Sequence, residues 1–209
     1  MNFRGTLTLL LIGGILFFAA PVFADSTSSG SFNFTSTLGT LGTTNTLTSG
    51  SFSVVATGYA APGMTTDLYA KNDGPNEIGM GLATGMDHEI GGTQFIQLNL
   101  TQILSTNPTS VMLGVGSIQF PDTYQIWGSN TAGALGTMLA TNQSSFTFDL
   151  SSFGKYDYIS VTSPTGTVLI DGLTVNQPLS QSTSEPNAAI LVLAGLAALA
   201  SIRLAGKKL

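Results

Sequence analysis

The sequence predicts an all-β protein: a single antiparallel, jelly-roll-like β-sandwich with an N-terminal signal helix and a C-terminal transmembrane helix. Three observations lead to this prediction. Apolar residues recur at every second position in several short segments, turn-forming residues separate these segments, and long apolar runs occur only at the two ends. No amphipathic helical pattern appears between residues 25 and 180.

The first 24 residues have the composition of a secretory signal peptide. Arg4 is their only charged residue, an apolar run covers residues 6–20, and small residues precede a cleavage point between Ala24 and Asp25. A retained membrane helix is the alternative. The run is short for a bilayer and Pro21 follows it, so we expect cleavage and export of the remaining chain.

Residues 25–176 are expected to form the β-sandwich. About eight to ten short strands, separated by Gly, Pro, Asn and Asp, favour a sandwich over a solenoid, because the chain has no repeat of fixed length. Residues 156–162 and 167–175 are expected to form a hairpin about the turn 163–166. The other alternating residues are Phe32 and Phe34; Phe52, Val54 and Ala56; Ile96, Leu98 and Leu100; Tyr124 and Ile126; and Phe146, Phe148 and Leu150.

The composition limits the chemistry of this domain. Only 8% of the residues are charged, there is no cysteine, and there is one histidine, so disulfides, zinc-thiolate sites and most hydrolytic triads are excluded. Residues 25–183 contain ten acidic and two basic side chains, a net charge of −8. Nucleic acid is therefore not an expected partner, since phosphate binding needs a basic face.

One acidic, glycine-rich stretch predicts a structural Ca²⁺ site. Asn72, Asp73, Glu77, Asp87 and Glu89 supply the oxygen ligands that calcium prefers, although their spacing is not that of an EF-hand. The alternative is an ordinary turn at 72–75 and a solvated loop at 87–89. His88 invites an acid–base role, but on a strand it would point away from both neighbouring carboxylates.

Aromatic residues on one expected strand suggest carbohydrate binding through Tyr124 and Trp127. Their positions have opposite parity, so Trp127 faces outward if Tyr124 faces the core. The alternative is that both fill buried faces. An acid-pair hydrolase would need two of Asp149, Asp157 and Asp171 to converge, and no local spacing identifies a pair. We therefore expect no enzymatic activity.

A polar linker at residues 177–183 leads to a tail at 184–209. Its apolar run, Ala188 to Ile202, approaches bilayer thickness when the following basic side chains extend toward the interface. With the body exported, Arg203, Lys207 and Lys208 stay on the cytoplasmic side as a membrane stop. A buried core helix is the alternative, but the run has almost no polar face.

This tail resembles a PEP-CTERM sorting signal, which exosortases of Gram-negative bacteria process. The resemblance rests on Ser184-Glu185-Pro186, with Ser184 in the place of the usual proline, followed by the short apolar segment and the basic end. It implies transient membrane anchoring, recognition near Glu185 and Pro186 by an exosortase-like membrane protease, and then release or attachment at the cell surface.

The sequence thus suggests an exported protein of the cell envelope or exopolysaccharide matrix with a structural or interaction role. The alternative is a carbohydrate-binding module for matrix polysaccharide, with or without a structural calcium ion. Exposure of Trp127 and its tyrosine neighbours would distinguish the two.

Overall fold

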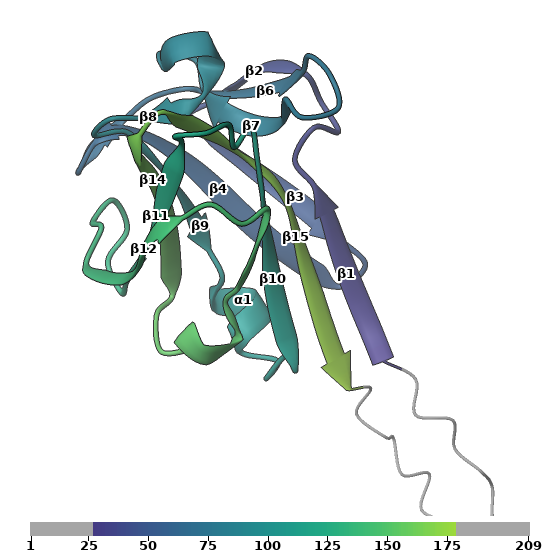
Figure 1. Cartoon of the computed structure of the whole chain (residues 1–209). Coiled ribbons are helices and arrows are strands. Elements are labelled where there is room, and N and C mark those ends of the chain that lie inside the picture. Colours follow the sequence, from purple (N-terminus) through teal and green to yellow (C-terminus); the bar gives the residue numbers. More distant parts are fainter. Residues whose placement is uncertain (1–26, 179–209) are drawn as a thin grey trace, which may run out of the picture.

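The computed structural model describes residues 27–178, which form two antiparallel β-sheets and very little helix (Figure 1). The first sheet has eight strands: β1 (Thr27–Asn33), β2 (Gly39–Gly42), β6 (Leu68–Asn72), β7 (Ile78–Leu82), β8 (Ile90–Gly91), β10 (Ser110–Gly116), β13 (Thr147–Asp149) and β15 (Thr167–Pro178). Its order is β13-β10-β15-β7-β6-β2, and β1 and β8 also pair with β15.

The second sheet has seven strands: β3 (Thr44–Ser49), β4 (Phe52–Ala61), β5 (Met64–Thr65), β9 (Phe95–Asn99), β11 (Thr123–Ser129), β12 (Thr137–Gln143) and β14 (Tyr158–Thr165). Its order is β12-β11-β14-β9-β4-β3, and β5 pairs with β4. The expected antiparallel β-sandwich is therefore confirmed. Several short strands, among them β2, β5 and β8, bring the number above the expected eight to ten.

The expected hairpin at 156–175 is wrong. β14 pairs with β9 and β11 in the second sheet, whereas β15 pairs with β10, β1, β7 and β8 in the first. Only Gly166 separates them, and its positive φ of 69° lets the chain pass from one sheet to the other. The alternation identified the two strands but carried no information about their partners.

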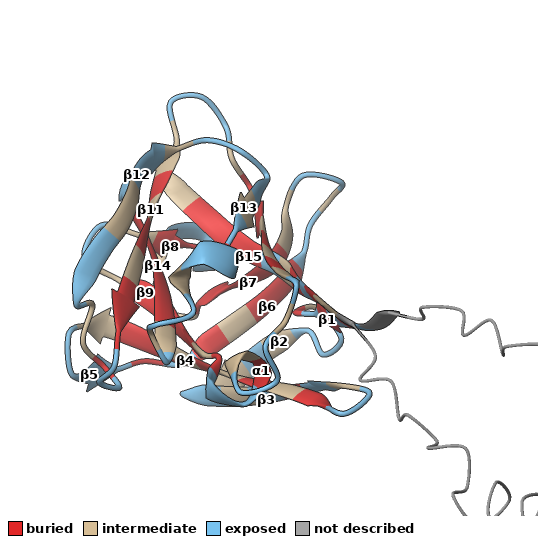
Figure 2. Cartoon of the chain, turned by 90° about the horizontal axis from the view of Figure 1, so that it is seen from below, coloured by how far each residue is buried: buried red, intermediate tan, exposed pale blue. Residues whose placement is uncertain are grey.

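The inward side chains of both sheets form one hydrophobic core, and exposed residues gather in the connecting loops (Figure 2). The expected alternation is confirmed on β4, where Phe52, Val54 and Ala56 are buried. β9 differs, because Phe95 and Gln97 on its outer face are buried as well. Phe146 also differs: it lies just before β13 with 57% of its surface exposed.

Helical structure in residues 27–178 is limited to α1 (Thr101–Leu104) and two 3-10 turns, η1 (Met86–His88) and η2 (Ser151–Phe153). Within this range no helix has the length and apolar character needed to cross a bilayer. The expected signal helix at 1–24 and transmembrane helix in 184–209 lie outside the described residues.

The two ends of the described chain are neighbours. β1 and β15 pair antiparallel in an unbroken register from Thr27 opposite Pro178 to Asn33 opposite Gly172. The segments before residue 27 and after residue 178 therefore join the domain at the same end, opposite the loops around β8 (Figure 1).

The buried Tyr124 predicts a loss of stability in alkali. Its ring lies in the core and its hydroxyl donates to the Ser145 carbonyl at 2.8 Å. Burial raises the pKa of Tyr124 to about 12, from 10.0. The neutral Tyr124 side chain contributes to the free energy of unfolding. This contribution is complete below pH 10 and falls by about 3 kcal/mol as the pH rises toward 12. Urea unfolding measured across this pH range should show that the free energy of unfolding falls less steeply with pH in Tyr124→Phe than in the wild type. An equal fall in both proteins would contradict the prediction.

Candidate functional site

The acidic residues that predict calcium gather around the buried side chain of Lys71. Lys71 is 4% exposed, and its Nζ lies 2.7 Å from Glu89 Oε1, 3.3 Å from Glu77 Oε2 and 3.9 Å from Asp73 Oδ2. Burial alone would lower the pKa of Lys71, but the hydrogen bonds and charges of Glu89 and Glu77 outweigh it and raise the pKa. Three of the five predicted calcium ligands thus surround an ammonium group.

Glu89 is the centre of this cluster. It is 3% exposed, and it accepts hydrogen bonds from the Ser117 hydroxyl at 2.8 Å and the Thr167 hydroxyl at 2.7 Å. Its donors come from β6, from the residue after β10 and from β15. The carboxylate therefore joins β6, β15 and the residue after β10 to the loop that precedes β8, and a cation and two hydroxyl donors face it.

The loop 83–89 lies close against the first sheet, and glycines make this approach feasible. A Cβ on Gly81 would stand 2.1 Å from the His88 carbonyl oxygen. His88 itself stacks on Tyr69, with ring centroids 3.9 Å apart, and its Nδ1 lies 3.2 Å from the Ala83 carbonyl oxygen. These contacts describe a loop histidine that packs on the sheet, with Asp87 exposed beside it.

Tyr124 and Trp127 point to opposite sides of the second sheet, as their parity predicts. Tyr124 is fully buried, so its ring cannot lie against a surface sugar. Trp127 is half-buried on the outer face, where its Nε1 donates to Thr162 Oγ1 at 3.1 Å. Of the predicted carbohydrate pair, only Trp127 reaches the surface.

A loop covers part of this outer face beside Trp127. The Gln97 amide, 2% exposed, donates to the Ala134 carbonyl at 3.0 Å and to the Ser160 hydroxyl at 3.1 Å, and accepts from the Gly133 amide at 2.8 Å. The loop 130–136 is thereby held over β9 and β14. This loop therefore reduces the area next to Trp127 that a ligand could contact.

The three aspartates considered for hydrolysis do not form one site. Asp157 lies just before β14 in the second sheet, while Asp149 on β13 and Asp171 on β15 belong to the first. Asp149 accepts two hydrogen bonds from Ser151, which lower its pKa. β10 separates β13 from β15, so Asp149 and Asp171 stand two strands apart.

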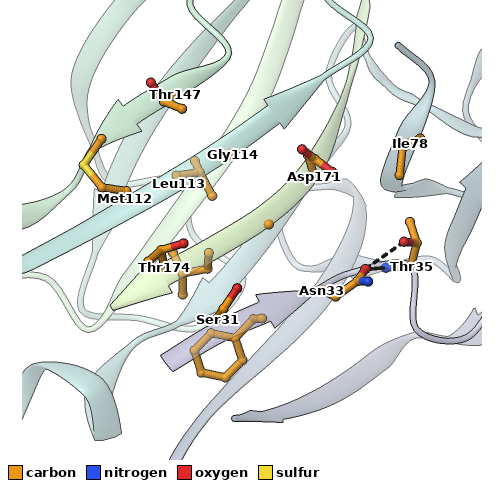
Figure 3. Close-up of a pocket in the computed structure, with 13 residues that line it drawn as sticks. Ser31, Asn33, Thr35, Ile78, Met112, Leu113, Gly114, Thr147, Asp171 and Thr174 are labelled. Carbon is orange, nitrogen blue, oxygen red and sulfur yellow. Dashed lines mark hydrogen bonds between the residues drawn. The ribbon is translucent and has the colours of Figure 1, made fainter. Parts of the chain in front are cut away.

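A groove of about 350 Å³ on the outer face of the first sheet is a further candidate site (Figure 3). Its floor is largely bare backbone, because Gly114 on β10 is paired with Gly172 on β15. Its lining includes the side chains of Ser31, Asn33, Thr35, Ile78, Met112, Thr147, Asp171 and Thr174. Polar groups from three strands, β1, β13 and β15, and from the turn after β1 thus surround a strip of sheet without side chains.

A β-bulge presents Asp171 to this groove. Gly114 pairs with Gly172 and Val115 with Ile170, so Asp171 is an extra residue on β15. Here β15 also exchanges its partner, because β1 pairs with it up to Gly172 and β7 pairs at Ile170. Asp171 is exposed at this fork, and no ion pair or hydrogen bond joins its carboxylate to the rest of residues 27–178.

The groove continues past Asp171 into a second hollow of about 330 Å³. Ile78 and Asp171 line both parts, and the second is completed by Pro75, Asn76, Val115, Gly116 and Phe146. A Cβ on Gly116 would lie 2.7 Å from the Ile78 carbonyl oxygen, so this glycine makes room for the crossing chain. Phe146 adds an exposed aromatic ring to the far wall.

Sequence reasoning missed this groove, although the sequence contains two signals for it. The first signal lies in residues 111–116. Val111, Leu113 and Val115 alternate there with Met112, Gly114 and Gly116, and the two glycines indicate a strand whose outer face has few side chains. Asp171-Gly172 interrupts an otherwise apolar strand, as bulges do.

The remaining predicted residues lie outside the described range. They are the signal cleavage residues Ala24 and Asp25, the sorting residues Ser184, Glu185 and Pro186, and the membrane-stop residues Arg203, Lys207 and Lys208.

We expect the buried ion pair to dominate the local stability. Lys71→Met leaves Glu89 buried without its cation and should lower the free energy of unfolding by about 3–5 kcal/mol. The double variant Lys71→Met/Glu89→Gln removes the orphaned charge and should recover much of this loss. Urea denaturation of both variants tests the pair, and a loss below about 1 kcal/mol in Lys71→Met would contradict it.

A structural calcium ion stays a prediction. Within residues 27–178, no three His, Cys, Asp or Glu side chains are grouped as a metal site would need. If calcium binds only the folded chain, a hundredfold excess over its dissociation constant adds about 2.7 kcal/mol and raises the melting temperature. Equal melting temperatures in calcium and in chelator would contradict the prediction.

Comparisons with known proteins give no relative for this chain: no family model, no curated protein and no solved structure matches it.

Proposed function

We propose that this chain is an exported, non-enzymatic protein of the cell envelope or exopolysaccharide matrix, held at the membrane by its C-terminal tail. The observation that carries the proposal is the pair of apolar segments at the two ends of the sequence, residues 6–20 and 188–202, and the pairing of Thr27 with Pro178 is compatible with it. Because both boundary segments join one end of the sandwich, a tail inserted in the membrane leaves the opposite end, with the loops around β8, directed outward (Figure 1).

The surface chemistry supports a role in interaction. Lys71 is enclosed by carboxylates, so Lys155 is the only exposed cationic side chain in residues 27–178. Exposed positions on β1, β3 and β12 are mostly Ser, Thr and Asn. Such a surface offers many neutral hydrogen-bonding groups and repels polyanions such as nucleic acid.

The tail is proposed to act as the resemblance implies. Residues 188–202 would hold the chain in the membrane, with Arg203, Lys207 and Lys208 on the cytoplasmic side, and an exosortase-like protease would act near Glu185 and Pro186. The alternation of the chain between its two sheets is consistent with a jelly-roll-like sandwich as the exported body.

Carbohydrate binding is the second candidate function. The half-exposed Trp127, which lies on the outer face of the second sheet, favours it. Binding of no polysaccharide on a glycan array would count against this function without affecting the export proposal.

Intact-mass measurement of the protein from wild-type and exosortase-deficient cells tests the proposed function. We expect a chain that begins at Asp25 in both, and that has lost the residues after the sorting motif only in wild-type cells. Glu185→Ala should block this loss, whereas the matched variant Ser182→Ala should not. A chain that ends at Leu209 in every case would contradict the proposal.

A further inference from the structure

We infer that the groove on the outer face of the first sheet binds a neutral polysaccharide chain, with Phe146 against a sugar ring and with Asp171 and Asn33 hydrogen-bonded to sugar hydroxyls. The inference rests on the proposed function, which places the domain among matrix polysaccharides. It assigns the ligand to residues on the opposite sheet from Trp127.

The shape of the groove suits a linear polymer. Its two hollows share Ile78 and Asp171, so they lie side by side along β10 and β15 and a linear chain can extend over both. Gly114 and Gly172 leave the floor without side chains where the strands pair. A flat ring can therefore approach the sheet backbone closely, as substrates do where glycine removes the side chain.

The polar groups along the groove include both hydrogen-bond donors and acceptors. Asn33 Oδ1 accepts from the Thr35 amide at 2.8 Å and from its hydroxyl at 2.7 Å, which fixes the side-chain amide and leaves its NH₂ group as a donor (Figure 3). The carboxylate of Asp171 supplies an acceptor, and the exposed hydroxyls of Ser31, Thr147 and Thr174 can do either. Sugar hydroxyls require this mixture.

Apolar surface stands beside these polar groups. Phe146 is 57% exposed at one end of the groove, and Met112 and Ile78 are half-exposed along it. A pyranose ring presents apolar C–H groups on its faces and hydroxyls at its rim, so an exposed aromatic ring next to directed polar groups matches it.

The charge of the groove selects among polysaccharides. Neither part of its lining contains Lys, Arg or His, and the exposed carboxylate of Asp171 has no cationic partner within residues 27–178. An anionic polymer would lose its hydration against this carboxylate without compensation. The site therefore fits an uncharged chain.

A peptide strand is a poorer occupant. Strand addition needs an open sheet edge, whereas β10 and β15 are paired on both sides where they form the floor. The groove lies on the face of the sheet, where its backbone groups are already bonded.

Titration calorimetry of the full chain tests the inference. The protein is kept in a zwitterionic detergent without a sugar headgroup, and the probes are gluco-, manno-, galacto- and xylo-oligosaccharides, with oligo-alginate as the anionic comparison. We expect at least one neutral oligosaccharide to bind and the alginate to bind more weakly. Phe146→Ala should weaken that binding by about 3- to 10-fold, and Asp171→Ala should weaken it as well.

Phe120→Ala is the matched control, because Phe120 is also an exposed phenylalanine but lies outside the groove. It should leave the affinity unchanged. Melting temperatures equal to that of the wild type show that each variant is folded, and Asp171→Asn, which keeps the side-chain shape, replaces Asp171→Ala if the latter is unstable.

Three results would overturn the inference: no neutral oligosaccharide binds the wild-type chain, alginate binds more tightly than the neutral probes, or the groove variants bind as tightly as Phe120→Ala. If the groove variants bind as tightly as Phe120→Ala and Trp127→Ala binds more weakly, the sugar lies on the second sheet. None of these results bears on the mass measurement, so the groove can fail while the export proposal stands.

Discussion

The pairing of β15 is the constraint on which the first sheet depends. This strand of twelve residues bonds to β10 along one edge, shares the other edge between β1 and β7, and pairs with β8 at its first two residues. One edge position cannot serve two partners, so the partners must change along the strand, and the change occurs beside the bulged Asp171. The fork and the exposed carboxylate are therefore consequences of one arrangement of hydrogen bonds, and the glycine pair of the floor lies next to them.

Two loops secure the outer faces of the sandwich, and each is held by buried polar groups. On the first sheet, Glu89 forms an ion pair with Lys71 and accepts hydrogen bonds from Ser117 and Thr167. On the second, the Gln97 amide is bonded on both its oxygen and its nitrogen. In a chain without disulfides, these saturated groups define where each loop rests, because any displacement would leave a buried donor or acceptor without a partner.

The sequence predicts what depends on nearest neighbours and fails where distant segments meet. Burial of one strand face imposes period two, so the inward residues of β4 and the opposite orientations of Tyr124 and Trp127 could be predicted. The separation of β14 and β15 into different sheets could not, since strand partners are chosen by long-range packing. For the same reason the ion pair between Lys71 and Glu89, which are far apart in the sequence, could not be predicted.

The attachment of the C-terminal segment to β15 has a mechanical consequence. A force applied at Pro178 along this strand acts parallel to β1 and β10, and so across the hydrogen bonds that join them. Such a load shears many bonds together, whereas a load at a sheet edge would open them one at a time. A molecule bound over Gly114 and Gly172 would pull on the same strand, so tension would pass from ligand to tail without crossing the hydrophobic core.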